Sequence, residues 1–312
     1  MTDRAPLFVV INTRSGRTAG DERCRLLASV FREGGREVEF LPVRTPAKLD
    51  AVAAQAVTRA AACRGVVVAA GGDGTLSAVA HATLGSDCAF GILPQGTFNY
   101  FGREHGVAQD IEGAARSLLR AKPQPVRVGL VNGRAFLVNA SLGLYPRLLE
   151  DREAYKRQLG RYRWVAIVSG LATLMRDHRQ LDLEIENGGH NRHLRTPTLF
   201  IGNNRLQFEQ SGLSTAADAL DAGQLAAIAV EPTRSRALFA LALRGAIGQL
   251  GSTGRVIEFP FRRLTVHVRG QRRVKVAADG EIHRMRSPLV FSVSPQPLRL
   301  MVPAEDDRQE RA

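Results

Sequence analysis

The feature that most constrains this chain is an apolar run that leads directly into a glycine-rich turn. Residues 66–70 read Val-Val-Val-Ala-Ala, and residues 71–75 read Gly-Gly-Asp-Gly-Thr. Such a run predicts a strand buried on both faces, as in a parallel sheet. Glycines let an anion approach the backbone, and the N-terminus of a following helix presents unpaired N–H groups to it. The segment therefore indicates an anion site, or a tight turn that needs glycine for its geometry alone.

The first 125 residues alternate between short β-branched runs and longer helical patterns. We expect strands at residues 7–12, 38–43, 65–70 and 89–93, and helices at 21–33, 47–62, 76–84 and 111–119. This alternation is typical of a mostly parallel sheet with helices on both faces. The sequence thus predicts a three-layer α/β domain over residues 1–125.

The pattern changes after Pro123 and Pro125. Residues 126–131 and 135–139 predict a hairpin around Asn132-Gly133, a strong turn signal. Further strands are expected at 181–186, 198–202, 225–230, 264–269, 273–277 and 289–293, with helices at 155–179 and 235–250. These patterns predict an antiparallel domain with helical insertions over residues 126–303, followed by a charged, frayed tail at 304–312.

Composition narrows the class of protein. The chain has 312 residues, of which 44% are hydrophobic, and a net charge of +13, so we expect two folded domains and an anionic partner. Its three cysteines include no C-x-x-C pair, which argues against a disulfide framework or a zinc site and favours the cytoplasm. We see neither a signal peptide nor an apolar run of about 20 residues, so membrane contact is expected from the surface only.

Two more glycine-containing turns follow predicted strands. Residues 94–99 read Pro-Gln-Gly-Thr-Phe-Asn, and residues 12–16 read Asn-Thr-Arg-Ser-Gly. The carboxyl ends of parallel strands lie on one edge of a sheet, where ligands of such sheets bind. Three polar turns at that edge favour nucleotide binding over turn geometry alone.

Together the three turns resemble the signatures of the diacylglycerol kinase catalytic-domain family of lipid kinases. That family has N-x-x-S-G, G-G-D-G-T and P-x-G-T-x-N in an N-terminal α/β domain, and D-G-E in a C-terminal antiparallel β-sandwich. The resemblance covers nearly the whole chain and implies a nucleotide cleft between the domains. The ATP-binding residues that it implies are Asn12, Thr13, Arg14, Ser15, Gly16, Thr45, Gly71, Gly72, Asp73, Gly74, Thr75, Leu76, Ser77, Gly96, Thr97 and Asn99.

Three carboxylates are candidates for chemistry. Asp73 beside a phosphate turn suggests a bound Mg²⁺ or a ribose hydroxyl, whereas Thr75 could cap the helix or contact phosphate. Asp279 and Glu281 flank Gly280, which alone would favour a polar hairpin turn. The resemblance makes Glu281 the acceptor of the lipid hydroxyl's proton and Asp279 a second essential carboxylate.

Departures from the family pattern affect two places. Tyr100 stands where the family usually has Asp, and Gly102 replaces a common Ala; neither removes a phosphate contact. The family's D-D-G-x-L segment holds a structural Mg²⁺ through the carboxylate before the Gly, which is Ala222 here. The matching backbone-carbonyl positions are Ala219 and Gln224, and Asp218 or Asp221 could substitute for the missing carboxylate.

These observations predict an ATP- and Mg²⁺-dependent lipid kinase whose first candidate substrate is diacylglycerol, converted to phosphatidic acid. Ceramide, a sphingoid base or phosphatidylglycerol are alternative acceptors. An NAD kinase shares G-G-D-G but does not match the later motifs. A basic nucleotide-binding regulator without catalysis is the alternative of another class.

The expected partners are a lipid substrate and an anionic membrane surface, with no nucleic acid and with a homodimer left open. Arg161 and Arg163 lead the apolar part of the helix predicted at 155–179, and three more arginines decorate the second predicted helix: Arg234, Arg236 and Arg244. Basic residues of this kind can lie on an anionic bilayer. We therefore expect a cytoplasmic protein that is peripheral at the inner face of the membrane.

Overall fold

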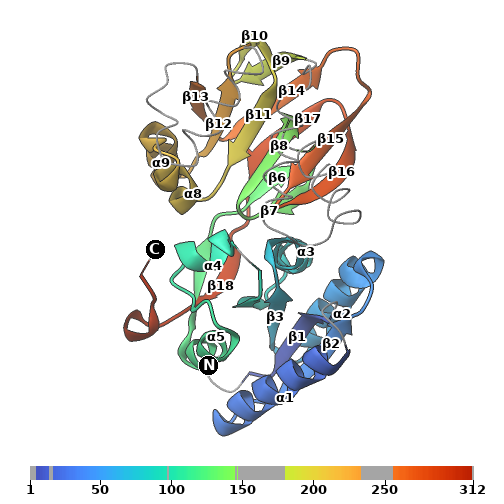
Figure 1. Ribbon diagram of the computed structural model, residues 1–312, viewed down its shortest axis with the longest axis vertical. Helices are drawn as coiled ribbons and strands as arrows, with labels where there is room; N and C mark the ends of the chain where they lie inside the picture. The colour runs from blue at the N-terminus through green and yellow to red at the C-terminus, as the bar shows by residue number, and fades with distance from the viewer. Residues whose placement is uncertain are drawn as a thin grey trace. The chain divides into compact units, whose positions relative to one another are not determined.

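A computed structural model describes residues 5–13, 17–96, 98–144, 146, 180–232 and 256–310 (Figure 1). The chain forms two compact units. Unit 1 comprises Met1–Val128 and Ser294–Ala312, and unit 2 comprises Gly129–Val293. Among the described residues, no helix is both long and apolar enough to cross a membrane.

Unit 1 is built on a six-stranded sheet in the order β2-β1-β3-β4-β18-β5. Its strands are β1 (Leu7–Asn12), β2 (Val38–Val43), β3 (Val66–Gly71), β4 (Ala89–Pro94), β5 (Lys122–Val126) and β18 (Leu298–Val302). Strands β1 to β4 are parallel, and every residue of β3 and β4 is buried. The parallel sheet expected from the continuous apolar runs is confirmed.

Helices pack on both faces of this sheet, α1 with α5 and α2 with α3 (Figure 1). Their bounds are α1 (Arg17–Glu33), η1 (Pro46–Lys48), α2 (Leu49–Cys63), α3 (Asp73–Thr83), α4 (Tyr100–Glu104), α5 (Ile111–Arg120) and η3 (Glu305–Asp307). Helix α3 begins three residues earlier than predicted, because the glycine turn closes directly into its first turn. Helix α5 is capped by Asp110, whose side chain accepts a hydrogen bond from the Gly113 N–H.

Strand β18 brings the end of the chain back into unit 1. It pairs in parallel with β4 and antiparallel with β5, whereas the sequence placed residues 294–303 in the second domain. The tail after it is ordered through Glu310: Asp307 pairs with Arg120, and the Gln309 N–H donates to the Gly106 carbonyl at 3.0 Å. Strand β5 lies at the edge of the sheet. Pro123 and Pro125 have no backbone N–H to donate, which an edge strand tolerates because only one of its sides is paired.

Unit 2 contains two six-stranded sheets whose pairings are all antiparallel. Sheet B has the order β10-β9-β14-β17-β6-β7, and sheet C has the order β13-β12-β11-β8-β15-β16. The strands are β6 (Gly129–Val131), β7 (Arg134–Phe136), β8 (Asn139–Gly143), β9 (Leu181–Asn187), β10 (His190–Thr196), β11 (Thr198–Gly202), β12 (Leu225–Val230), β13 (Val256–Phe261), β14 (Arg263–Val268), β15 (Arg273–Ala278), β16 (Glu281–Arg286) and β17 (Leu289–Val293).

The two sheets share one hydrophobic core, so unit 2 is a β-sandwich, as expected. Side chains such as Phe136 and Phe291 of sheet B meet Leu142 and Val276 of sheet C in this core. Helices α8 (Arg205–Gln210) and α9 (Ser214–Asp221) pack on the outer face of β12 in a second, smaller cluster. The predicted helices at 155–179 and 235–250 lie outside the described residues.

Leu300→Asp tests the place of β18. Leu300 is fully buried in the middle of the unit 1 sheet, so an unpaired carboxylate there should lower the free energy of unfolding by about 3 kcal/mol or more. Arg299→Ala, at the exposed neighbouring position, is the control and should change it by less than about 1 kcal/mol. Urea unfolding measures both variants; equal stability would contradict a central β18.

Candidate functional site

The predicted nucleotide turns meet at one edge of the unit 1 sheet. In the parallel register Asn12 lies beside Val43, and Gly71 lies beside Pro94, so β1, β2, β3 and β4 all end at this edge. The turns that begin with residues 12, 44, 71 and 94 are therefore neighbours, as expected. Arg14, Ser15, Gly16 and Thr97 lie outside the described residues.

The turn between β3 and α3 depends on glycine for close packing. A Cβ atom on Gly71 would lie 2.6 Å from Thr75 Cβ, closer than real contacts allow. Gly72 is the N-cap residue, and its carbonyl accepts from Thr75 N–H at 2.9 Å. The predicted capping role of Thr75 is therefore wrong. Thr75 is buried in the first helical turn, where its hydroxyl accepts from Asn12 Nδ2 at 3.4 Å.

The turn after β4 lies against this first turn. Gln95 N–H donates to the Gly71 carbonyl at 2.8 Å, and a Cβ on Gly96 would lie 3.1 Å from Gly72 Cα. The two glycine backbones thus approach with no side chain between them. Arg23 Nη1 donates to Gln95 Oε1 at 2.9 Å, which ties α1 to the same turn.

Asn99 fixes the shape of the second turn. Its Oδ1 accepts from Gly96 N–H at 2.9 Å, and its Nδ2 donates to the Gly96 carbonyl at 3.0 Å and to Gln109 Oε1 at 3.1 Å. Asn99 is buried and has a φ of 47°, a left-handed conformation that asparagine tolerates better than most residues. Its side chain shapes the turn, a role that the motif spacing did not reveal.

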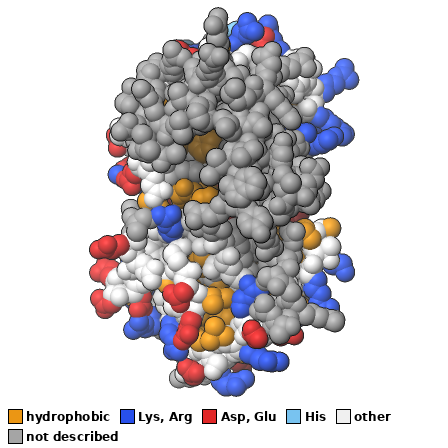
Figure 2. Space-filling view, in the orientation of Figure 1, with side chains coloured by type: hydrophobic (Ala, Val, Ile, Leu, Met, Phe, Trp, Pro, Cys, Tyr) orange, Lys and Arg blue, Asp and Glu red, His pale blue; other side chains and the backbone are white. Residues whose placement is uncertain are grey.

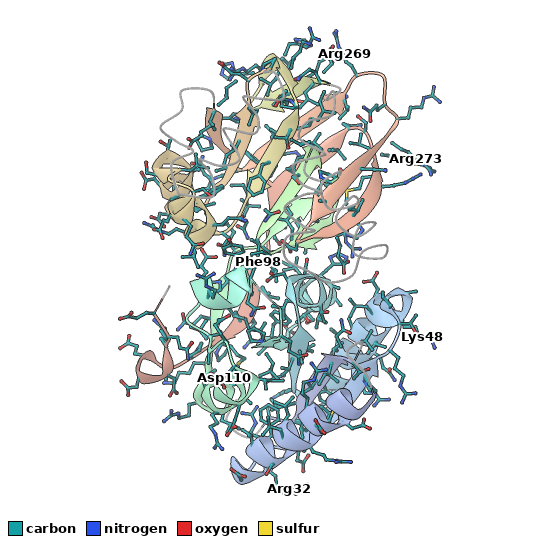
Figure 3. All side chains as sticks on the ribbon, viewed as in Figure 1. Arg32, Lys48, Phe98, Asp110, Arg269 and Arg273 are labelled. Atoms are coloured by element: carbon teal, nitrogen blue, oxygen red, sulfur yellow. The ribbon has the colours of Figure 1, made fainter. Side chains whose placement is uncertain are left out.

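An exposed aromatic pair follows this turn. Phe98, labelled beside α4 in Figure 3, is 53% exposed, and its ring stacks on Tyr100 at a centroid distance of 5.9 Å. The Arg103 guanidinium lies 5.7 Å from the Tyr100 ring centroid. Tyr100 therefore fills the position of the family's usual Asp with part of an aromatic and cationic stack.

The other predicted ATP residues differ in exposure. Leu76 and Ser77 are buried in α3. Asn12, Thr13 and Asp73 are half-buried, and Thr13 donates through both its N–H and its hydroxyl to the Val43 carbonyl. Thr45 is exposed and is the N-cap residue of η1, where its side chain makes no capping hydrogen bond.

The second set of predicted residues lies in unit 2, at the turn between β15 and β16. Asp279 and Gly280 have φ values of 45° and 82°, as a two-residue hairpin turn requires, which confirms the turn interpretation. Glu281 is the first residue of β16 and is exposed. Asp279, by contrast, is only 7% exposed.

The Asp279 carboxylate binds three consecutive backbone amides. Oδ2 accepts from Leu137 N–H at 2.7 Å, and Oδ1 accepts from Val138 and Asn139 N–H at 2.9 Å each. Both oxygens are thus committed to residues 137–139. These hydrogen bonds hold the turn of the hairpin that carries Glu281 against residues 137–139.

Asn203 completes the hydrogen bonding of the same segment. Its Nδ2 donates to the Leu137 carbonyl at 2.9 Å, and its N–H donates to the Val138 carbonyl at 2.8 Å. Beside it, Asn139 Nδ2 donates to Gln207 Oε1 at 3.1 Å. Sequence reasoning missed this network, although Asn203-Asn204 directly after a predicted strand was an available signal.

The residues left for a structural Mg²⁺ do not fit such a metal. The Ala219 carbonyl accepts from Gln224 N–H at 3.0 Å, and the Asp221 carboxylate pairs with Arg205. Hydrogen bonds to Asp221 and then to Glu209 raise the pKa of the Arg205 guanidinium above its usual value. Within the part of the chain that the structure describes, no group of three or more His, Cys, Asp or Glu could hold a metal ion.

Asp279→Asn tests the positioning role. An amide cannot accept all three N–H groups, so we expect the free energy of unfolding to fall by about 2–3 kcal/mol. Asp218→Asn, on the exposed face of α9, is the matched control and should change it by less than about 0.5 kcal/mol. If Asp279→Asn abolished turnover with stability unchanged, the carboxylate would act in catalysis instead.

Comparison with known proteins supports one family. The diacylglycerol kinase catalytic domain matches residues 6–131. A Pseudomonas aeruginosa (strain UCBPP-PA14) protein named "Probable lipid kinase YegS-like" is 32% identical over 97% of this chain and 96% of its own. A diacylglycerol kinase of Bacillus subtilis (strain 168) is 31% identical over 46% of this chain and 47% of its own.

Solved structures agree on the fold. A crystal structure of a diacylglycerol kinase from Bacillus anthracis str. Sterne has a TM-score of 0.65 and 16% identity, covering 97% of this chain and 98% of the other. The full-length similarity to the Pseudomonas protein extends the relationship beyond the matched domain. The chain belongs to the diacylglycerol kinase catalytic-domain family of lipid kinases.

Proposed function

We propose that this protein transfers the γ-phosphoryl group of ATP to a hydroxyl of a lipid, with diacylglycerol as the first candidate acceptor. The observation that carries the proposal is the close approach of the two glycine turns, where Gln95 N–H binds the Gly71 carbonyl. Ceramide, sphingoid bases and phosphatidylglycerol are the alternative acceptors. A lipid substrate also implies a place at the membrane surface, which we propose to be the cytoplasmic face.

The glycine turns provide a surface suited to phosphate. The backbones of Gly72 and Gly96 pack against each other without an intervening side chain. Gly72 is the N-cap of α3, so the first N–H groups of that helix lie next to this contact. Asp73, half-buried in the first turn of α3, is the carboxylate that would hold Mg²⁺ there. The ion would neutralise charge on the transferred phosphoryl group.

Glu281 is the proposed proton acceptor for the lipid hydroxyl. It is exposed at the start of β16, whereas both oxygens of Asp279 already accept backbone N–H groups. A general base must come within hydrogen-bonding distance of the hydroxyl whose proton it accepts. Phosphoryl transfer depends mainly on positioning, so Asp279 contributes by holding the hairpin in place.

Glu281→Gln provides the direct test of the function. Transfer of label from radioactive ATP is measured with diacylglycerol, ceramide, sphingosine and phosphatidylglycerol in mixed micelles, and with NAD as a non-lipid acceptor. We expect turnover of one lipid to fall by about 100-fold or more, since general bases contribute about that much, with ATP affinity retained. Glu186→Gln, an exposed residue of β9, is the control and should keep full turnover.

The outcomes separate the alternatives. Unchanged turnover in Glu281→Gln would remove it as the base, and label in NAD alone would indicate an NAD kinase. ATP binding without transfer to any acceptor would favour the non-catalytic regulator.

Gly96→Ala tests the nucleotide turn. The new Cβ would lie 2.7 Å from Asn99 Oδ1 and 3.1 Å from Gly72 Cα, so the turns must separate. We expect the dissociation constant for ATP to rise about tenfold or more, since such overpacking costs about 1–3 kcal/mol. Gly189→Ala is the control: Gly189 has a φ of 83° in the open β9–β10 turn, so alanine there is strained but meets no neighbouring atom. This variant shows the effect of destabilisation without a change in the turn. Equal ATP affinity in both variants, by calorimetric titration, would contradict the site.

A further inference from the structure

The edge hairpin β15–β16 carries four cations that face one another. Arg273 lies directly opposite Arg286, and Lys275 lies directly opposite Arg284 in the antiparallel register. All four side chains are exposed. We call these residues the cationic strip: Arg273, Lys275, Arg284 and Arg286.

The strip projects from the outer face of sheet C. Val274 and Val276 alternate with its residues along β15 and are buried in the sandwich core, and Met285 of β16 packs against that core. Glu281 shares the face of Met285 because side chains alternate along a strand. The strip is therefore separate from the proposed base, and changes in it leave Glu281 in place.

The hairpin β9–β10, at an edge of sheet B, shows the opposite arrangement. Across β9–β10, Arg195 lies opposite Asp182 and His193 lies opposite Glu184. His193 also pairs with Asp182, and Arg269 pairs with Glu184 at 2.5 Å. Opposite charges on facing strands stabilise a sheet, so this edge is electrostatically balanced.

On β15–β16, by contrast, each of the four cations faces another cation in the antiparallel register. Residues 273–286 contain only two acidic residues, Asp279 in the turn and Glu281 on the other face. Among the ion pairs between described residues, none includes Arg273, Arg284 or Arg286. Figure 3 shows Arg273 extending away from the hairpin, and Figure 2 shows Lys and Arg side chains gathered along that margin.

Like charges directly opposite one another destabilise a hairpin. Residues two apart on a strand lie about 7 Å apart and facing residues about 5 Å apart, so four charges occupy a small flat area. The repulsion is relieved when an anionic surface lies against the strip. Ile282, half-buried on the same face of β16, adds an apolar side chain next to the cations.

We propose that the cationic strip docks the protein on the surface of an anionic lipid bilayer. The choice of a bilayer rests on the proposed function, since an enzyme that acts on a lipid hydroxyl must reach it at a membrane. A flat face of cations beside an apolar side chain suits the headgroup region of such a surface. The docking surface thereby includes the strand that begins with Glu281.

The test compares two variants of the full chain that lose the same charge. Arg284→Gln/Arg286→Gln removes half of the strip, and Arg192→Gln/Arg195→Gln removes two exposed arginines from β10, an edge strand of sheet B. Binding is measured by sedimentation with vesicles of phosphatidylcholine containing phosphatidylglycerol, and with vesicles of phosphatidylcholine alone. One basic residue near an anionic surface contributes about fivefold, so the strip variant should bind about 25-fold more weakly and the β10 variant nearly as wild type.

Thermal unfolding supplies a second measurement. The strip variant should unfold at a higher temperature than wild type, because the cross-strand repulsion is relieved. Its turnover in detergent micelles without anionic lipid should match wild type. If the wild-type protein had no lipid kinase activity, the proposed function would be overturned. The vesicle comparison would still decide whether the strip is a docking surface.

Three results would overturn the docking proposal. These are equal loss of vesicle binding in both variants, wild-type binding that is independent of anionic lipid, and displacement from vesicles by duplex DNA at matched phosphate concentration. The last result would make the strip a nucleic-acid surface instead.

Discussion

The contact between the Asp279 carboxylate and the backbone of residues 137–139 is the interaction on which unit 2 depends most. These residues connect β7 of sheet B to β8 of sheet C, so they lie where the chain crosses between the two layers. All six of their backbone polar groups are paired: three N–H groups with the carboxylate, two carbonyls with Asn203, and the last carbonyl with Asp279 N–H. A buried crossing without these partners would leave several polar groups unsatisfied, each at a substantial cost. The same contact fixes the hairpin that carries Glu281.

Unit 1 depends on a different constraint, the absence of side chains where two turns meet. Gly71, Gly72 and Gly96 let the backbones of the β3 and β4 turns approach until Gln95 N–H reaches the Gly71 carbonyl. Asn99 then holds the second turn from within. In this chain, a buried carboxylate therefore stabilises the layer crossing of unit 2, whereas glycines allow the two turns of unit 1 to pack against each other.

Much of the architecture could be predicted from the sequence because the burial pattern is strong. Continuous apolar runs identified β1, β3 and β4, and Asn132-Gly133 identified the β6–β7 hairpin, since each signal is local. Strand β16 was missed because its Arg and His residues mask the alternation that an edge strand normally shows. Strand β18 was not predicted, and its residues were assigned to the second domain, because its partners β4 and β5 are far away in sequence.

The site was predictable to a similar extent. Glycine motifs reveal where a backbone must come close, so the turns that follow β3 and β4 were correctly predicted to lie at one sheet edge. The motif could not reveal that the carboxylate of Asp279 faces inward, because its three partners lie about 140 residues earlier. Long-range hydrogen bonds of this kind leave no periodic signal in a sequence.

The position of β18 has a consequence for how the protein folds during its synthesis on the ribosome. Residues 298–302 are inserted between β4 and β5, so the unit 1 sheet lacks an inner strand until nearly the whole chain has been synthesised. The β-sandwich, encoded between the two parts of that sheet, is complete in sequence earlier. During translation the sandwich can therefore fold first, although the first half of the other unit emerges before it. A nascent chain that stalls before β18 would expose the flank of β4, a ready template for aggregation.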